Sequence, residues 1–184
     1  MKNLLSTVRA EQVTPYHMTM LRSIDETDFR GVCRKAKEEL QKQGAVPDSG
    51  FLVEGILVLK QYYAIAALDS RNMHAVSDAI DPFWHAHILH TEEYFEFCSR
   101  IFGHYLHHHP LDHESDRDVK VMDRLYRYTV WCYDQFFNYV NPTFFPKELP
   151  VYRLVCKHQL VTTEEIWQNG ILPENPEMQP QVFL

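Results

Sequence analysis

The sequence predicts an all-α fold, a compact bundle of about five helices with a proline-containing C-terminal tail. Three observations support this prediction. Apolar residues recur at helical spacing over long segments, ordinary helix start and stop signals flank those segments, and prolines interrupt the last part of the chain at Pro173, Pro176 and Pro180. At 184 residues, the chain fits one domain that buries about 70% of the surface of its unfolded form. We therefore expect one helical domain over residues 1–172 and an extended tail over residues 173–184.

The first two predicted helices span residues 29–43 and 51–68. An acidic stretch at residues 25–28 precedes the first helix and Gly44 follows it, as expected for negative charge at a helix start and glycine after a helix end. A turn-rich connection leads to residues 51–68, which are almost wholly apolar. This second segment is typical of a central, buried helix.

The third predicted helix covers residues 83–102. Asp81 suits the N-cap, and Pro82 suits the first helical position, where no N–H is needed. Gly103 stands where a left-handed C-terminal cap is expected. Such a helix has about 20 residues and is about 30 Å long.

The last two predicted helices follow a short polar connection at residues 104–113. Ser115 or Asp116 can cap a long aromatic helix that runs to about residue 138. Residues 162–165 have the spacing of a capping box, which predicts a short helix that ends near Gly170.

Composition narrows the class of protein. The net charge is −7, from 18 basic and 25 acidic residues, and the basic residues form no long run, so a nucleic-acid partner is not expected. No segment approaches the roughly 20 apolar residues of a membrane span, and the amino end carries charge before a signal-peptide core could form. Four cysteines without a CxxC pair suggest free thiols in a reducing compartment. We therefore expect a cytoplasmic protein with no membrane partner.

Histidine is concentrated in one part of the chain. Seven of the eleven histidines lie between residues 85 and 109: His85, His87, His90, His104, His107, His108 and His109. Imidazole is the commonest metal-binding side chain, and it also titrates near neutral pH. The concentration therefore predicts either a metal site or a site that handles protons.

A helical projection divides the histidines of the third helix between two faces. One stripe holds His85 together with Asp81, Glu92 and Glu96, and the opposite stripe holds His87 together with Thr91, Tyr94 and Cys98. From an undistorted helix, His85 and His87 cannot both bind one ion. Two metal sites follow, one for each face.

The first site uses His85 with Asp81, Glu92 or Glu96, completed from another helix. The second uses His87, with Cys98 as a possible ligand, completed by His107, His108 or His109. We favour the second site, because it places its ligands in a buried pocket where an unpaired imidazole would be costly. The candidate metal ligands are therefore Asp81, His85, His87, His107 and His108.

Other interpretations of the same residues stay open. His87 can be a hydrogen-bonded core histidine beside Tyr94, and the carboxylate stripe can be a solvated helix face. The cluster can also serve as an acid/base site without metal. A non-catalytic interaction module, in which the motif only fixes local geometry, is the competing functional hypothesis.

The chain contains no HExxH helix, GxSxG elbow, P-loop or GxGxxG turn, so hydrolase and nucleotide-binding classes have no motif support. Tyr, Trp and Cys side chains near the histidines favour redox or tailoring chemistry on a small-molecule or peptide substrate. Tyr94 and Cys98 are then the candidate catalytic residues. The expected cofactor is a divalent or redox-active metal ion: iron, zinc or copper.

One segment resembles a known family. Residues 81–91, with the string Asp-Pro-Phe-Trp-His-Ala-His-Ile-Leu-His-Thr, continue to Tyr94, Cys98, a Phe-Gly pair and a His-His-His-Pro run. This order is similar to the motif of the glycine-rich domain-containing protein-like family. The resemblance highlights a site without implying a reaction, at Asp81, Trp84, His85, His87, Thr91, Tyr94, Cys98, His107 and His108. This chain has six glycines and lacks the glycine-rich tail of the longer family members.

Overall fold

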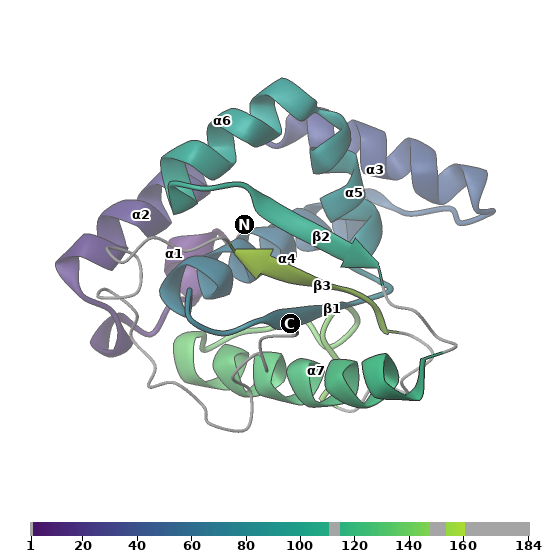
Figure 1. Ribbon diagram of the computed structural model, residues 1–184. Coiled ribbons are helices and arrows are strands. Elements are labelled where there is room, and N and C mark those ends of the chain that lie inside the picture. Colours follow the sequence, from purple (N-terminus) through teal and green to yellow (C-terminus); the bar gives the residue numbers. More distant parts are fainter. Residues whose placement is uncertain (1, 111–114, 148–153, 161–184) are drawn as a thin grey trace.

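The computed structural model describes residues 2–110, 115–147 and 154–160. Within these ranges it contains seven α-helices, one short 3-10 helix and a three-stranded antiparallel sheet (Figure 1). The prediction of a mainly helical chain is confirmed. Its count of about five helices is too low, and the all-α prediction did not include the sheet. The predicted helix at residues 162–170 and the tail at residues 173–184 lie outside the described residues.

The elements follow one another in this order: α1 (Leu4–Thr7), η1 (Ala10–Gln12), α2 (Pro15–Glu26), α3 (Arg30–Lys42), α4 (Ser49–Leu68), β1 (His74–Ser77), α5 (Asp81–Leu89), α6 (Thr91–Phe102), β2 (Leu106–Pro110), α7 (Asp116–Phe136) and β3 (Leu154–Leu160). The sequence did not predict α1 or α2. The start signal of α2 is nevertheless present, because the Thr14 hydroxyl accepts a hydrogen bond from the backbone N–H of His17 and Pro15 opens the helix.

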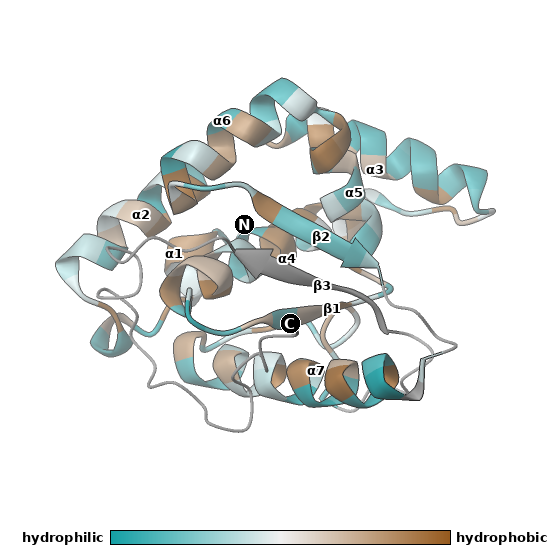
Figure 2. Cartoon of the chain, in the orientation of Figure 1, coloured by the Kyte–Doolittle hydropathy of each residue, from teal (hydrophilic) through white to brown (hydrophobic). Residues whose placement is uncertain are grey.

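Helix α4 forms the centre of the core. The Asp48 side chain caps it by accepting a hydrogen bond from the N–H of Phe51, at 2.7 Å. The helix packs closely on α5, since a Cβ atom added at Gly55 would lie 2.2 Å from the ring of Phe83. By contrast, α3 is amphipathic. Figure 2 shows hydrophilic residues over most of it, and its buried residues are Val32, Ala36 and Leu40.

One expectation about membranes is corrected. By length and composition, α4 is apolar enough to cross a bilayer, whereas the sequence analysis expected no segment to come close. In the fold, 72% of its most apolar window is buried inside the protein. Helix α4 is therefore a buried helix of the protein core.

The predicted single helix at residues 83–102 is two helices. The chain leaves helical geometry at His90, where φ is −85° and ψ is 66°, and α6 restarts at Thr91. No proline or glycine marks the break, so local sequence signals did not reveal it. The ring of His90 instead packs against α3, where a Cβ atom at Gly31 would lie 3.3 Å from its Cε1 atom.

The sheet has the strand order β1-β3-β2, and β3 pairs with both neighbours in antiparallel register. Helix α7 packs against β1 and β3 and runs below the strands in Figure 1. Strand β2 replaces the polar connection predicted at residues 104–113. Its backbone pairs with β3, far along the chain, and such long-range pairing outweighs the low strand propensity of a histidine run.

Candidate metal centre

Asp81 lies at the amino end of α5, but it is not the N-cap residue that the sequence predicted. Ile80 occupies the N-cap position, and Asp81 and Pro82 are the first two helical residues. The Asp81 carboxylate instead contacts two histidines. Its Oδ2 atom lies 3.5 Å from Nδ1 of His85, one helical turn later, and its Oδ1 atom lies 3.1 Å from Nε2 of His108.

The two histidines also contact each other across α5 and β2. Nε2 of His85 lies 2.9 Å from Nε2 of His108, and the ring centroids are 4.5 Å apart. At this distance, one nitrogen must present a lone pair to the other. His108 Nε2 therefore lies between two groups that can each present a lone pair, His85 Nε2 and the Asp81 carboxylate.

These three side chains, Asp81, His85 and His108, form the surface centre. One potential ligand atom from each lies within 4.8 Å of the other two. Ligands held about 2.1 Å from one ion lie about 3.0 Å apart when their bonds meet at a right angle, and about 3.4 Å apart in a tetrahedron. The contacts of 2.9 and 3.1 Å are close to the first value. The residues are therefore spaced to hold an ion with small adjustments.

Exposure differs among the three residues. The side chain of His85 is 51% exposed, whereas those of Asp81 and His108 are 16% and 14% exposed. Asp81 and His108 are thus mostly buried, and His85 is in contact with solvent. An ion bound here would have coordination positions open to an incoming molecule.

Buried hydrogen bonds hold β2 in place beside α5. The Tyr94 hydroxyl donates to the carbonyl oxygen of Leu106 at 2.6 Å and accepts from Nε1 of Trp84 at 3.0 Å. The Trp84 ring also contacts the His108 ring edge-on, with centroids 4.8 Å apart. These contacts fix the strand two residues before His108, so they position its ring against α5.

His87, the centre of the favoured second site, lies in the hydrophobic core. Its ring is 3% exposed and is surrounded by the rings of Phe29, Tyr63, Tyr94 and Phe97. Nδ1 of His87 lies 2.8 Å from the Tyr63 hydroxyl. Burial, followed by the charge of His90, lowers the pKa of His87 to about 3. This is the arrangement of a neutral core histidine, one of the interpretations that the sequence left open.

The second predicted site is not assembled. Cys98 is buried on α6, and burial raises the pKa of its thiol to about 11. His107 is exposed on β2 and contacts the rings of Tyr105 and His109. Glu92 and Glu96, candidates for the first site, are exposed on α6, beyond the break at His90. The structure therefore combines His85 and Asp81 of the first site with His108 of the second.

The candidate catalytic residues Tyr94 and Cys98 do not reach the surface centre as ligands. Tyr94 is fully buried, and burial raises the pKa of its hydroxyl far above the ordinary range. Its hydrogen bonds to Trp84 and Leu106 place it behind the centre. Its visible role is to support β2.

A second polar cluster, which the sequence analysis missed, lies in the core. It consists of Asp69 at the end of α4, His74 on β1 and Cys132 on α7, and each of these residues is 0% exposed. His74 lies outside the dense histidine segment, and Cys132 is one of the four cysteines that the sequence suggests are free thiols. A carboxylate directly after an almost wholly apolar helix is the one signal in the sequence.

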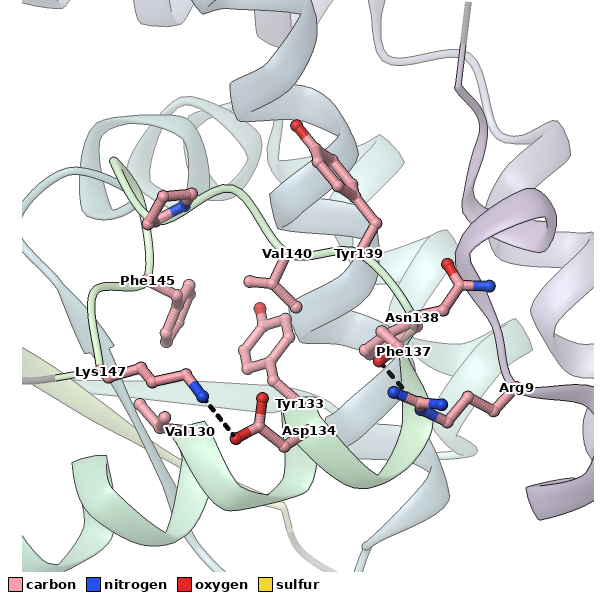
Figure 3. A pocket seen from close by; sticks show the side chains of 11 residues that line it. Arg9, Val130, Tyr133, Asp134, Phe137, Asn138, Tyr139, Val140, Phe145 and Lys147 are labelled. Atoms are coloured by element: carbon pink, nitrogen blue, oxygen red, sulfur yellow. Dashed lines mark hydrogen bonds and ion pairs between the residues drawn. The ribbon is translucent and has the colours of Figure 1, made fainter.

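A cleft of about 170 Å³ lies elsewhere, at the end of α7 (Figure 3). Its charged groups are already engaged, since Lys147 Nζ lies 3.4 Å from an Asp134 oxygen and Arg9 Nε donates to the Phe137 carbonyl at 3.2 Å. None of its lining residues belongs to the surface centre or to the core cluster. The cleft therefore adds no groups to either.

Comparison with known proteins gives a family. The model of the UCP032817-like family matches residues 19–158, which is more than half of the chain and includes the surface centre and the core cluster. The chain belongs to the UCP032817-like family. No curated protein and no solved structure matches this UCP032817-like chain. The resemblance of residues 81–110 to the glycine-rich domain-containing protein-like motif stays a prediction.

Proposed function

We propose that the protein binds one divalent transition-metal ion through Asp81, His85 and His108 and acts as a small metalloenzyme. One observation carries the proposal: two imidazole nitrogens and a carboxylate from α5 and β2 converge within 4.8 Å at the surface of the fold. Because each of the three groups can present a lone pair toward the others, one metal ion can bind all of them together.

The donor set suits particular ions. Two histidines and one carboxylate with open positions are typical of non-haem iron(II) centres, and zinc also accepts nitrogen and carboxylate ligands with an open position. We favour iron(II) or zinc over copper for this reason. When bound, such an ion supplies Lewis acidity or an activated oxygen ligand. The solvent side of the ion, next to the half-exposed His85, would be accessible. Asp81 and His108 are mostly buried on the opposite side.

The substrate class follows from the openness of the centre. We propose redox or tailoring chemistry on a small molecule or peptide that approaches from the side of His85, because that ligand is half exposed.

Free thiols at Cys33, Cys98 and Cys132 support a reducing compartment such as the cytoplasm.

Elemental analysis of the untagged protein tests the metal site directly. Wild type and two variants, His85→Ala and His108→Ala, are washed with chelator, reloaded with iron(II) or zinc and analysed for bound metal. Each variant should lose one bound ion per chain, and metal that still binds at the surface centre should bind at least tenfold more weakly. His107→Ala is the matched control, since it removes a neighbouring exposed histidine of β2 that is outside the centre. Equal metal content in His107→Ala, His108→Ala and wild type would refute the site.

A further inference from the structure

The core cluster gathers three polar groups, from β1 and α7, around one carboxylate oxygen of Asp69. Oδ2 of Asp69 lies 3.1 Å from Nε2 of His74, 3.8 Å from Sγ of Cys132 and 2.7 Å from the Tyr128 hydroxyl. Asn72 Nδ2 donates to Oδ1 of the same carboxylate at 2.9 Å. A carboxylate with no solvent contact is costly to bury unless a positive charge or strong donors compensate for it.

The His74 ring lies between Thr129 and Asp69. The Thr129 hydroxyl donates to the Leu125 carbonyl at 2.7 Å, accepts from the backbone N–H of Ala75 at 3.0 Å and lies 3.3 Å from Nδ1 of His74. On the other side of the ring, Nε2 lies 3.1 Å from Oδ2 of Asp69. An imidazole nitrogen, a carboxylate oxygen and a thiol therefore lie within 4.8 Å of one another with no solvent exposure, and zinc binds all three kinds of group.

We propose that Asp69, His74 and Cys132 bind a structural zinc ion in the core of this protein. The separations of 3.1 and 3.8 Å lie on either side of the edge of a zinc tetrahedron, which is about 3.3 to 3.7 Å for oxygen, nitrogen and sulfur ligands. The contact between Nδ1 of His74 and the Thr129 hydroxyl holds the ring in the orientation for ligation, as partners of ligating histidines commonly do.

A fourth donor is available beside the three ligands. Asn72 is 4% exposed, its amide nitrogen lies at the cluster, and its Oδ1 atom is buried without a hydrogen-bond partner. A half turn of the amide exchanges these two atoms and brings the oxygen to the cluster. Tyr128 supplies a second nearby oxygen, hydrogen-bonded to Asp69.

Charge balance favours the ion over a bare network. Zinc displaces the thiol proton of Cys132 to solvent, and the resulting thiolate together with the Asp69 carboxylate neutralises the two positive charges of the ion. The centre is then uncharged overall, which suits a site with no solvent access. The ion would tie the end of α4 to β1 and α7, because each ligand comes from a different one of these elements.

A sulfur ligand makes this site distinguishable from the surface centre, which contains no cysteine. The full chain, carrying His85→Ala and His108→Ala, is produced in zinc-supplemented medium, washed with chelator and analysed for metal and for zinc–sulfur scattering by X-ray absorption. We expect one retained zinc with a sulfur neighbour at about 2.3 Å. Absence of retained metal would overturn the proposal and leave Asp69, His74 and Cys132 as a buried polar network.

Cobalt substitution adds a readout that depends on the particular thiol. Protein produced in cobalt-supplemented medium should show a near-ultraviolet thiolate-to-cobalt band, and Cys132→Ser should lose it. The control Cys98→Ser removes another buried thiol, on α6, and should keep the band. A band that persists in folded Cys132→Ser would refute the site. If that variant does not fold, the zinc–sulfur measurement on the chain with intact Cys132 decides the question. Loss of surface metal alone would refute only the proposed surface centre.

Discussion

The two faces of α5 place the same kind of side chain in opposite environments. His85 faces outward, half exposed, next to Asp81 and His108. His87, two residues later, is 3% exposed within a cage of aromatic rings, hydrogen-bonded to Tyr63. Solvent access and polar neighbours favour metal binding on the outer face, whereas burial keeps the inner imidazole neutral. The comparison shows that histidine density identifies a segment and that the neighbours decide what each histidine does.

The largest expected effect is on the inner face. His87→Ala should lower the free energy of unfolding by about 3 kcal/mol, because it leaves a cavity and a buried Tyr63 hydroxyl without the partner it has now. Urea unfolding in the presence of chelator measures this loss. The metal content of the surface centre should be unchanged in the folded variant.

A double-mutant cycle with Tyr63→Phe isolates the hydrogen bond within that loss. The double variant carries no unpaired hydroxyl, so the two single losses should sum to more than the loss in the double variant. Strict additivity would mean that the contact between Tyr63 and His87 contributes nothing, and that the loss is due to packing alone.

The next effect is on the pH dependence of stability. The pKa of His87 is about 3 in the fold and 6.5 in its ordinary state, so the unfolded chain takes up a proton that the fold excludes. Stability from this group is complete above pH 6.5 and falls as the pH decreases toward 3, by up to about 1.4 kcal/mol per pH unit. Urea unfolding at several pH values should give a shallower slope for His87→Gln than for wild type. Equal slopes would mean that folding does not lower the pKa of His87.

The smallest effect on the free energy of unfolding is expected on the outer face, when the surface centre holds no metal. His85→Ala should change the free energy of unfolding by less than about 0.5 kcal/mol in chelator, because the side chain is half exposed. Zinc bound at the surface centre should stabilise wild type by about 2.7 kcal/mol at a hundred times its dissociation constant, and this part of the gain should be absent in the variant. Thermal unfolding with and without zinc separates the two cases. A large loss in chelator would make His85 a structural residue and favour the interaction-module hypothesis.

Local sequence patterns predicted much of the difference between the two faces of α5. The helical projection separated His85 from His87 and placed Asp81 beside His85, because one turn of helix depends only on nearby residues. It could not supply His108 as their partner, because that contact depends on the pairing of β2 with β3, more than forty positions along the chain. The core cluster was missed for the same reason, since Asp69, His74 and Cys132 come together only through tertiary packing.

The break at His90 shows a further limit of sequence patterns. Residues 83–102 have continuous helical spacing, yet the chain leaves helical geometry where the His90 ring meets α3 at Gly31. The helical projection that aligned Glu92 and Glu96 with His85 assumed one straight helix axis. With the axis broken, those carboxylates belong to a different helix, so α5 alone supplies the helical ligands of the surface centre.

The central position of β3 also sets an order of assembly during synthesis. His74 on β1 and His108 on β2 both lie opposite His158 of β3, so both strands find their partner in the same late segment. A ribosome makes β1 and β2 long before it reaches Leu154. Neither strand has its neighbour in the sheet until that segment has emerged, and pairing over such separations is slow. The nascent chain would therefore complete the sheet that holds His108 only after residues 154–160 have been made, when the seven described α-helices have already been made.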